Sequence, residues 1–186
     1  SYGGRDYFVA KLDSLSNVIW LHNLGSTGNE YVVGGLEVAD DGSVFITGGF
    51  RDEFFYTPTL SITSTGGFDT FILKYDTDGN VLWIKHSGQG PGNQRPMTLA
   101  VDANSVLVSG FFTDTIKFDG EEAFRSNNAI DDFYYAKFAQ TDGNLTWAKQ
   151  CRGIDNPGSG RISAIRTDPG FYSFAGLFLD SISIGD

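Results

Sequence analysis

The chain has 186 residues, of which 40% are hydrophobic and 15% aromatic, and its formal net charge is −10. This length suffices for one hydrophobic core, and the composition lies outside the range of disordered proteins. The negative charge disfavours binding to the phosphates of nucleic acids or to anionic membrane surfaces. A single cysteine, Cys151, excludes an intrachain disulfide, and no apolar run is long enough to cross a bilayer.

The residue types predict an all-β protein. The chain contains 24 Gly, 16 Phe and 8 Tyr residues. No long segment has apolar residues recurring every three or four positions, which is the pattern of an amphipathic helix. We therefore expect strands joined by glycine-containing turns.

In chain order, the first expected strands are residues 6–13, "DYFVAKLD", and the segment that ends at Trp20. Residues 35–40, "GLEVAD", and 43–50, "SVFITGGF", follow with a tight turn between them. A longer connection, 51–67, then leads to a second copy of the first pair, "DTFILKYDTDGNVLWIKH". We call these four strand types C, D, A and B, in the order in which they first appear.

The same pattern occurs three times in a strict register of about 63 residues. Several residue types recur at this interval, namely Asp6, Asp69 and Asp132; Lys11, Lys74 and Lys137; Trp20, Trp83 and Trp147; and Gly48, Gly110 and Gly176. Four antiparallel strands per unit cannot bury both faces of their sheet, so neighbouring units must stack. Such units, stacked radially, are the blades of a β-propeller, whereas solenoid rungs usually repeat at shorter intervals.

The expected boundaries divide the chain into a partial propeller. They comprise strands C and D of a first blade in 1–33, a second blade in 34–87, a third blade in 97–152, and strands A and B of a fourth blade in 162–186. Because three blades cannot close a ring, we expect the rest of a longer polypeptide, or other copies of the chain, to complete it. Trp and Phe positions should fill the space between blades.

The segments "GGFDTFILKYDTDGNVLWIK" and "VADDGSVFITGGF", with their copies, resemble the SBBP-type bacterial β-propeller repeat. The resemblance covers nearly the whole chain and implies a secreted or cell-surface scaffold or adhesion module. The third unit departs from the pattern at Ala139, where the first two units have Asp13 and Asp76. Part of the sequence also looks like the docking motif of quinoprotein propellers, and this leaves a glycan-active or quinoprotein-like enzyme as the alternative.

Candidate ligand-binding residues lie in the connections from strand D to strand A, residues 25–33, 88–97 and 153–161. In a propeller these connections gather at one face. Their polar residues would suit a glycan or a protein ligand, and they are Asn29, Glu30, Tyr31, Asn93, Gln94, Arg95, Asn156 and Arg161. The alternative is that Gly, Pro and Asn in these connections only turn the chain.

Catalytic and metal-binding patterns are weak. "DTDGN", residues 76–80, has two carboxylates but no following bidentate Glu, so we expect a hairpin turn rather than a calcium loop. His22 and His86 fall in different units, and no nucleophile elbow or phosphate loop occurs. We expect no catalytic residues, no cofactor and no metal, no nucleic-acid partner, no membrane insertion, and an extracellular or cell-surface location.

Overall fold

The computed structural model of the chain consists of strands, turns and connections. The residues that it describes are 2–30, 32–88, 90–118, 123–126, 131–153, 161–168, 171–177 and 182–184. These residues form β-strands and contain no helix, which confirms the all-β class. No membrane-spanning helix therefore occurs in this described part of the chain.

The second unit forms a four-stranded antiparallel sheet whose strand order follows the sequence. Its strands A to D are β3 (Val32–Val38), β4 (Val44–Phe50), β7 (Asp69–Tyr75) and β8 (Val81–His86). β4 and β7 pair without a register shift. This is the four-stranded antiparallel meander of a propeller blade, and we call it the central sheet.

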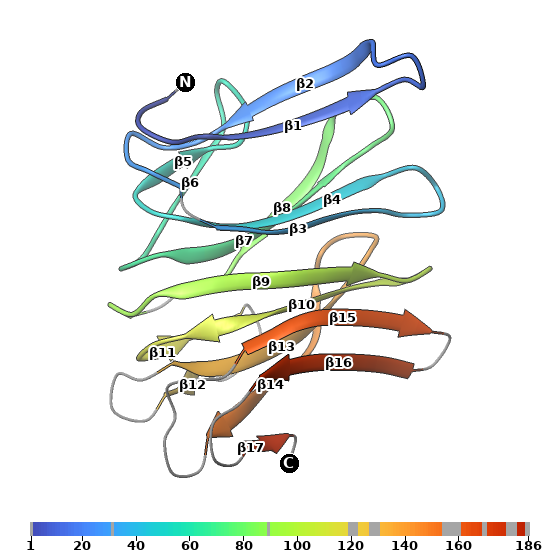
Figure 1. The fold of residues 1–186 in the computed structure, drawn as a ribbon. Helices are drawn as coiled ribbons and strands as arrows, with labels where there is room; N and C mark the ends of the chain where they lie inside the picture. Colours follow the sequence, from blue (N-terminus) through green and yellow to red (C-terminus); the bar gives the residue numbers. More distant parts are fainter. Residues whose placement is uncertain are drawn as a thin grey trace.

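The third unit forms a second antiparallel sheet, the lower sheet in Figure 1. Its strands A to D are β9 (Gln94–Val101), β10 (Ser105–Phe112), β13 (Asp132–Ala139) and β14 (Leu145–Gly153). A short fifth strand, β17 (Ile182–Ile184), pairs with the outer edge of β14. The sequence did not predict this fifth strand, because β17 is three residues long and pairs with a distant segment.

Two hairpins flank these sheets. β1 (Tyr7–Leu12) pairs with β2 (Val18–Leu24), and β15 (Arg161–Asp168) pairs with β16 (Phe171–Leu177). The first hairpin corresponds to strands C and D and the second to strands A and B. In Figure 1 the β1–β2 hairpin lies above the central sheet, and the β15–β16 hairpin overlaps the lower sheet, whose strands β9 and β10 contact β15.

The connections from strand B to strand C contain small hairpins that the sequence did not reveal. They are β5 (Glu53–Phe55) with β6 (Ser61–Thr63), and β11 (Thr115–Ile116) with β12 (Phe124–Arg125).

These connections also bond to the strand D of the preceding unit, always five residues after its tryptophan. Gly25 and Phe55 exchange two backbone hydrogen bonds of 3.0 and 2.8 Å, and Gly88 N–H donates to Lys117 O at 3.2 Å. Arg152 pairs with Ser183 of β17 in the same way. Each unit is therefore tied to the next at its outer edge.

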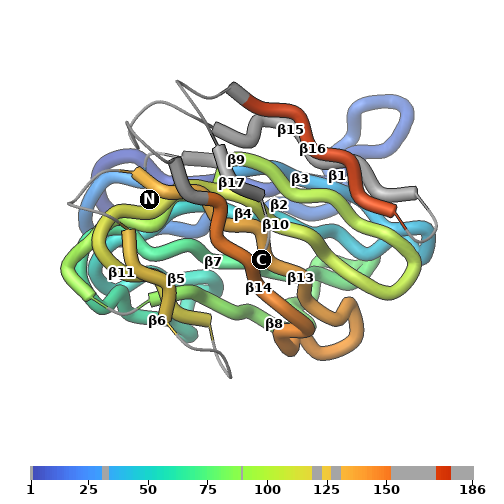
Figure 2. Tube along the Cα trace, turned by 90° about the horizontal axis from the view of Figure 1, so that it is seen from below, coloured from blue at the N-terminus to red at the C-terminus, as the bar shows by residue number. Residues whose placement is uncertain are grey.

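The A strands lie side by side through the stack, with β3 against β9 and β9 against β15. Figures 1 and 2 agree that the A–B and C–D turns lie on one side of the molecule, while the D–A and B–C connections lie on the opposite side. We call these the turn side and the loop side. Both follow from the antiparallel order, since alternate strand ends must meet on the same side.

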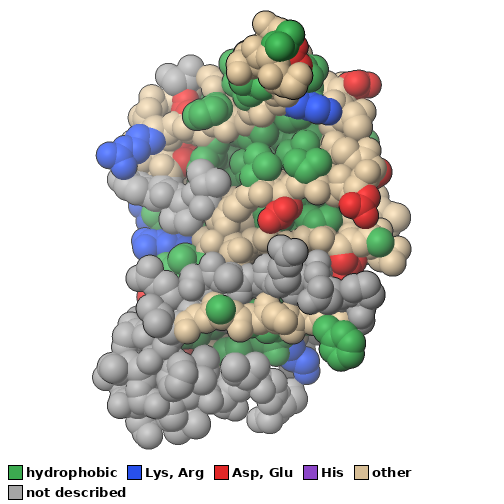
Figure 3. All heavy atoms as spheres, turned by 45° about the vertical axis from the view of Figure 1, so that its right-hand side comes forward, with side chains coloured by type: hydrophobic (Ala, Val, Ile, Leu, Met, Phe, Trp, Pro, Cys, Tyr) green, Lys and Arg blue, Asp and Glu red, His purple; other side chains and the backbone are tan. Residues whose placement is uncertain are grey.

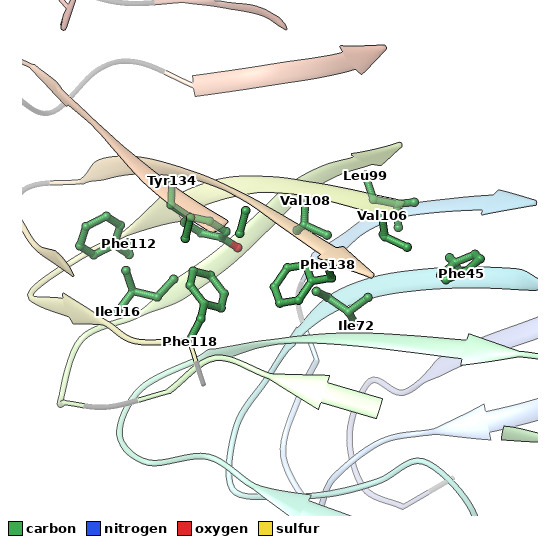
Figure 4. Close-up of a cluster of buried hydrophobic side chains, with 12 residues drawn as sticks. Phe45, Ile72, Leu99, Val106, Val108, Phe112, Ile116, Phe118, Tyr134 and Phe138 are labelled. Carbon is green, nitrogen blue, oxygen red and sulfur yellow. The ribbon is translucent and has the colours of Figure 1, made fainter. Parts of the chain in front are cut away.

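The hydrophobic core lies between neighbouring units. The cluster between the central and lower sheets includes Phe45, Ile72, Val108, Tyr134 and Phe138 (Figure 4). A second cluster joins the β1–β2 hairpin to the central sheet, and a third joins β13 and β14 to Phe174 of β16. Each sheet is thus buried by its neighbours, as expected of a stacked repeat.

A repeated Lys–Trp contact explains part of the sequence period. Lys11 and Trp20 are cross-strand partners, and both donate to Thr77 O, at 2.9 and 3.2 Å. Lys74 and Trp83 form the same pair and both donate to Gln140 O at 3.1 Å. In each case the acceptor is in the C–D turn of the next unit.

The tryptophan rings leave no room for a side chain at one position of that turn, so glycine occupies it. A Cβ atom at Gly79 would lie 2.9 Å from the Trp20 ring, and one at Gly143 would lie 2.8 Å from Trp83. Both glycines have positive φ, 86° and 70°. The third pair, Lys137 and Trp147, has the same cross-strand position.

Candidate functional site

The repeated aspartate that opens strand C lies on the loop side. Asp6 Oδ2 accepts the N–H of Tyr2 at 2.7 Å, and Asp69 Oδ2 accepts the N–H of Thr65 at 2.9 Å. Their Oδ1 atoms are buried and have no hydrogen-bond partner among the described residues. Burial raises the pKa of Asp69, while the Thr65 N–H and the nearby His86 act against that rise.

Asp132, the third member of this series, accepts the side-chain N–H of Gln150 at 2.7 Å. All three carboxylates therefore have a hydrogen-bonding role where strand C begins.

Asn29 and Asn93 hold the D–A connection against the start of strand C. The Oδ1 atom of Asn29 accepts Arg5 N–H at 2.9 Å, and that of Asn93 accepts Phe68 N–H at 3.2 Å. A Cβ atom on the adjacent Gly4 would lie 2.2 Å from Asn29 Oδ1. The structure thus gives both asparagines a structural role through this oxygen.

Gln94 and Arg95 are the first residues of β9, whereas the sequence placed them in a connection. Gln94 is fully buried, and its side-chain N–H donates to Thr115 O of β11 at 2.8 Å. Gln94 therefore holds the B–C hairpin of its own unit through its side-chain N–H. Arg95 is half-buried, on the loop side.

Arg95 and Arg51 share one aromatic ring. The Arg51 guanidinium carbon lies 4.9 Å from the centroid of the Phe68 ring, and that of Arg95 lies 5.5 Å from the same centroid. Arg95 is also 5.8 Å from the centroid of Phe111. We call this group, Arg51, Phe68, Arg95 and Phe111, the Phe68 site.

The Phe68 site is built from two units. Phe68 directly precedes the repeated Asp69, Arg51 follows β4, and Arg95 and Phe111 are cross-strand partners in the lower sheet. Phe68 is buried, whereas Arg51 is exposed. Sequence analysis named Arg95 alone of these four residues, because the members of the site come from segments that only the stacking of units brings together.

The positive charge of the Phe68 site is incompletely balanced. Neither guanidinium forms an ion pair with a carboxylate of the described residues. The buried Nε–H of Arg95 also lacks a hydrogen-bond acceptor among them. Burial raises the pKa of the nearby Asp131, and the positive charge of Arg95 opposes this rise.

Glu30, just before β3, occupies the position that Gln94 occupies one repeat later, at the start of β9. Glu30 N–H donates to Arg5 O at 2.9 Å, and Gln94 N–H donates to Phe68 O at 2.6 Å. Glu30 is 5% exposed, and its Oε1 accepts the hydroxyl of Ser26 at 2.6 Å while its Oε2 is buried without a described partner. Burial, with a smaller contribution from the negative charge of Asp6, raises the pKa of Glu30.

The other candidates in the D–A connections give less information. Tyr31 and Asn156 lie outside the described residues. Arg161 begins β15 and pairs with Leu177, which is the register position that Arg95 has opposite Phe111.

The "DTDGN" segment is a hairpin turn. Asp76 Oδ1 accepts the N–H groups of Asp78 and Asn80 at 2.9 and 2.8 Å, and Asp76 Oδ2 accepts the Asn80 side chain at 2.9 Å. These hydrogen bonds, led by that from the Asn80 side chain, lower the pKa of Asp76. The carboxylate is therefore already satisfied by its own turn.

The histidines lie in aromatic surroundings. The His22 ring stacks on Tyr75 with centroids 5.1 Å apart, and the His86 ring is 5.8 Å from Phe50. Within the described ranges, no three His, Cys, Asp or Glu residues form a group that could hold a metal ion.

Two relatives resemble part of the chain. A WD repeat-containing protein of Acanthamoeba polyphaga mimivirus is 27% identical over 127 residues, which are 61% of this chain and 9% of the relative. The regulatory protein FlaEY of Caulobacter vibrioides is 30% identical over 111 residues, 58% of this chain and 11% of that protein. The chain thus corresponds to about a tenth of either relative. No family model matches the chain.

These similarities agree with the architecture. The chain is a β-propeller-like repeat protein, in which four-stranded antiparallel units stack as part of a propeller.

Proposed function

We propose that the chain is a non-enzymatic binding module, and that the Phe68 site binds a carboxylate-bearing glycan. The observation that carries the proposal is the pair of guanidinium groups, Arg51 and Arg95, beside one phenyl ring. Guanidinium groups bind carboxylates through paired, charge-assisted hydrogen bonds. The ring limits their motion, so less conformational entropy is lost on binding.

The position of the site supports this proposal. It lies on the loop side, where the D–A and B–C connections of two units meet. Functional residues are concentrated on such connections when a rigid scaffold positions them. The scaffold here is the stacked core, which holds Phe68 and Phe111 in adjacent units. An acidic polysaccharide offers a series of carboxylates that two separated guanidinium groups can bind together.

The proposal includes a structural role for the repeat and an extracellular or cell-surface location. The structural role is supported by the inter-unit hydrogen bonds and by the similarity to a WD repeat-containing protein. The partners would be further repeats, in the same polypeptide or in other copies, together with the glycan. The location rests on the resemblance to SBBP-type repeats, and antibody detection in culture medium, cell-surface and cytosolic fractions tests it.

Titration calorimetry with polygalacturonate and neutral dextran tests the binding proposal. We expect binding of polygalacturonate alone, weakened at least about tenfold in the double variant Arg51→Gln/Arg95→Gln, since a charged hydrogen bond contributes about 1.5–3 kcal/mol. Arg125→Gln is the control, because it removes an exposed arginine of the B–C hairpin outside the site. Equal losses in both variants, or a preference for poly-glutamate, would contradict a glycan site.

A turnover assay addresses the enzymatic alternative. The same polysaccharide is incubated with the protein, and new reducing ends and unsaturated sugars are measured. We expect none above background. Cleavage that depends on the protein would replace the binding module by a glycan-active enzyme.

A further inference from the structure

A hollow of about 250 Å³ lies between the central sheet and the lower sheet. One wall is formed by Lys85 and His86 of β8, and the facing wall includes Phe138 of β13 and Asn144 of the C–D turn. Phe118 of the B–C connection also lines the hollow, and its ring centroid lies 5.7 Å from that of Phe138 (Figure 4). We call this space the Phe138 hollow. It combines two phenyl rings with two basic side chains.

The Phe138 hollow lies between two complete units. Its two walls belong to the central and lower sheets, each of which contains strands of all four types. It is therefore distinct from the exposed apolar surface that Figure 3 shows in the upper part of the molecule, where the β1–β2 hairpin lies. Its residues also differ from those of the Phe68 site. The shape of the hollow thus comes from the packing of one complete unit on the next.

The preceding interface, between the β1–β2 hairpin and the central sheet, shows how the corresponding space is filled. In the repeat, His22 corresponds to Lys85, and Tyr75 corresponds to Phe138. The imidazole ring of His22 stacks on Tyr75, with ring centroids 5.1 Å apart and an angle of 5° between the planes. A Cβ atom at Gly79 of the C–D turn would lie 2.8 Å from His22 Nε2. A planar ring therefore occupies the space between this turn and strand C.

The interface between the central and lower sheets has no such ring. A Cβ atom at Gly143 would lie 2.9 Å from Lys85 Cγ, so the lysine stem passes the C–D turn where the imidazole lies in the preceding interface. Lys85 Nζ then donates to Asn144 Oδ1 at 3.2 Å. Among the described residues, the ring contact of Phe138 is with Phe118, and no ring of β8 stacks on it. The replacement of an imidazole by a lysine thus leaves space beside Phe138.

We propose that the Phe138 hollow binds a small planar aromatic carboxylate. The ring of this ligand stacks on Phe138 as His22 stacks on Tyr75, and its carboxylate accepts a hydrogen bond from Lys85 Nζ. The stacking geometry is the one that aromatic pairs favour, since their centroids usually lie about 4.5–7 Å apart. The inference does not depend on the glycan proposal, because the two sites share no residue.

The volume of the hollow sets the size of the ligand. A dry cavity of about 150 Å³ binds benzene, and sites for drug-sized molecules span about 300–1,000 Å³. At about 250 Å³ the Phe138 hollow lies between these values. It therefore suits two fused rings, or one ring with a short substituent.

Lys85 sets the charge of the ligand. An ammonium group has three donors, and the printed acceptor of Lys85 is the neutral amide oxygen of Asn144. A carboxylate is a stronger acceptor for this group, because the hydrogen bond is then assisted by charge on both sides. His86 is the other ionisable residue of the lining, and no described lining residue is acidic. Asp142, in the same turn, does not line the hollow and accepts two hydrogen bonds from Asn144.

Binding of 2-naphthoate tests the proposal, because this probe combines two fused rings with a carboxylate. Backbone amide NMR shifts report where it binds. We expect saturable shifts in β8 and in residues 138–145. Neutral 2-naphthalenemethanol has the same rings without the charge and should bind at least about tenfold more weakly. Shifts confined to Arg51, Arg95 and their neighbours would place the probe at the Phe68 site and overturn the inference.

Lys85→His uses the repeat to close the hollow. Its imidazole should stack on Phe138 as His22 stacks on Tyr75, so the fold should be retained while the affinity for 2-naphthoate falls at least about tenfold. The matched control is Arg125→His, which replaces an exposed cationic side chain outside the hollow and should bind as the wild type does. Lys85→Met keeps an unbranched stem without the charge, and it should bind 2-naphthoate and its alcohol with equal affinity.

Circular dichroism and thermal unfolding verify that each variant is folded. The proposal is overturned by a wild-type protein without saturable shifts, by a Lys85→His variant that binds as the wild type does, or by an alcohol that binds as tightly as 2-naphthoate. If Lys85→His fails to fold, Lys85→Met decides, since an unchanged preference for the carboxylate would also overturn the proposal. None of these outcomes depends on whether polygalacturonate binds.

Discussion

β1 and β7 are the same strand of the repeat, 63 residues apart, yet they differ in burial. All seven residues of β7 are buried, whereas β1 has two buried residues among six. Both strands alternate apolar residues in the same way, so their own sequences do not cause the difference. The cause is the neighbouring unit, because the β1–β2 hairpin covers one face of β7 and no described element covers the equivalent face of β1.

The largest expected effect follows directly from this comparison. Phe71→Ala should lower the free energy of unfolding by about 3–5 kcal/mol, because it leaves a cavity between two units. Phe8→Ala should change it by no more than about 0.5 kcal/mol at low protein concentration, where the ring is in water. Urea denaturation measures both variants. Equal losses would mean that β1 is already covered in the isolated chain.

A second prediction compares glycines of strand B. A Cβ atom at Gly110 would lie 2.2 Å from the backbone oxygen of Arg95, while one at Gly49 would meet nothing closer than 3.8 Å. Gly110→Ala should therefore destabilise by about 1–3 kcal/mol, since the backbone of β9 must move. Gly49→Ala should stay within about 0.5 kcal/mol. Thermal unfolding followed by circular dichroism distinguishes the two, and similar melting temperatures would contradict the close approach at Gly110.

The Lys–Trp contacts and the start of β9 differ in how far the sequence could predict them. Lys11 and Trp20 donate to one carbonyl of the next unit, and Lys74 and Trp83 do the same one repeat later. Their regular spacing therefore made the repeat predictable. The start of β9 was placed too late because Pro96 cannot donate to a sheet, and the structure accommodates Pro96 opposite Gly110 at a register shift.

The Phe68 site shows what a single unit cannot reveal. Arg51 and Phe68 belong to the second unit and Arg95 to the third. Phe68 has Arg5 and Asp131 as its equivalents in the repeat, and of the three residues Arg95 alone keeps its type, at Arg161. A site that is assembled across an interface and absent from the other units has no periodic signal. Asn29 and Asn93 illustrate the converse, because both recur and both hold the backbone.

A third prediction concerns the tryptophan contacts. Trp83→Phe keeps an aromatic ring against Gly143 but removes the N–H that donates to Gln140 O. The loss should be about 0.5–1.5 kcal/mol, the usual net contribution of one hydrogen bond, and smaller than that of Phe71→Ala. Trp20→Phe should lose a similar amount, because its N–H donates to Thr77 O at 3.2 Å. Urea denaturation of both variants tests whether the two interfaces are equivalent; unequal losses would show that they are not.

The smallest expected effect concerns Glu30. Its side chain ends in a carboxyl group that can titrate, whereas its counterpart Gln94 ends in an amide that cannot. Because burial raises the pKa of Glu30, the native state binds this proton more tightly than the unfolded chain. The stabilisation of the native state that comes from this tighter proton binding is complete below the pKa of Glu30 in the unfolded chain. It is lost as the pH rises through the pKa in the native state. Glu30→Gln removes this dependence and supplies the amide that the third unit has, so its stability relative to the wild type should increase from pH 4 to pH 7. Urea denaturation at several pH values measures the difference.

Glu37→Gln is the control, since it removes the same charge from an exposed side chain. A Glu30→Gln curve parallel to that of the wild type would mean that Glu30 is as well solvated in the native state as in the unfolded chain.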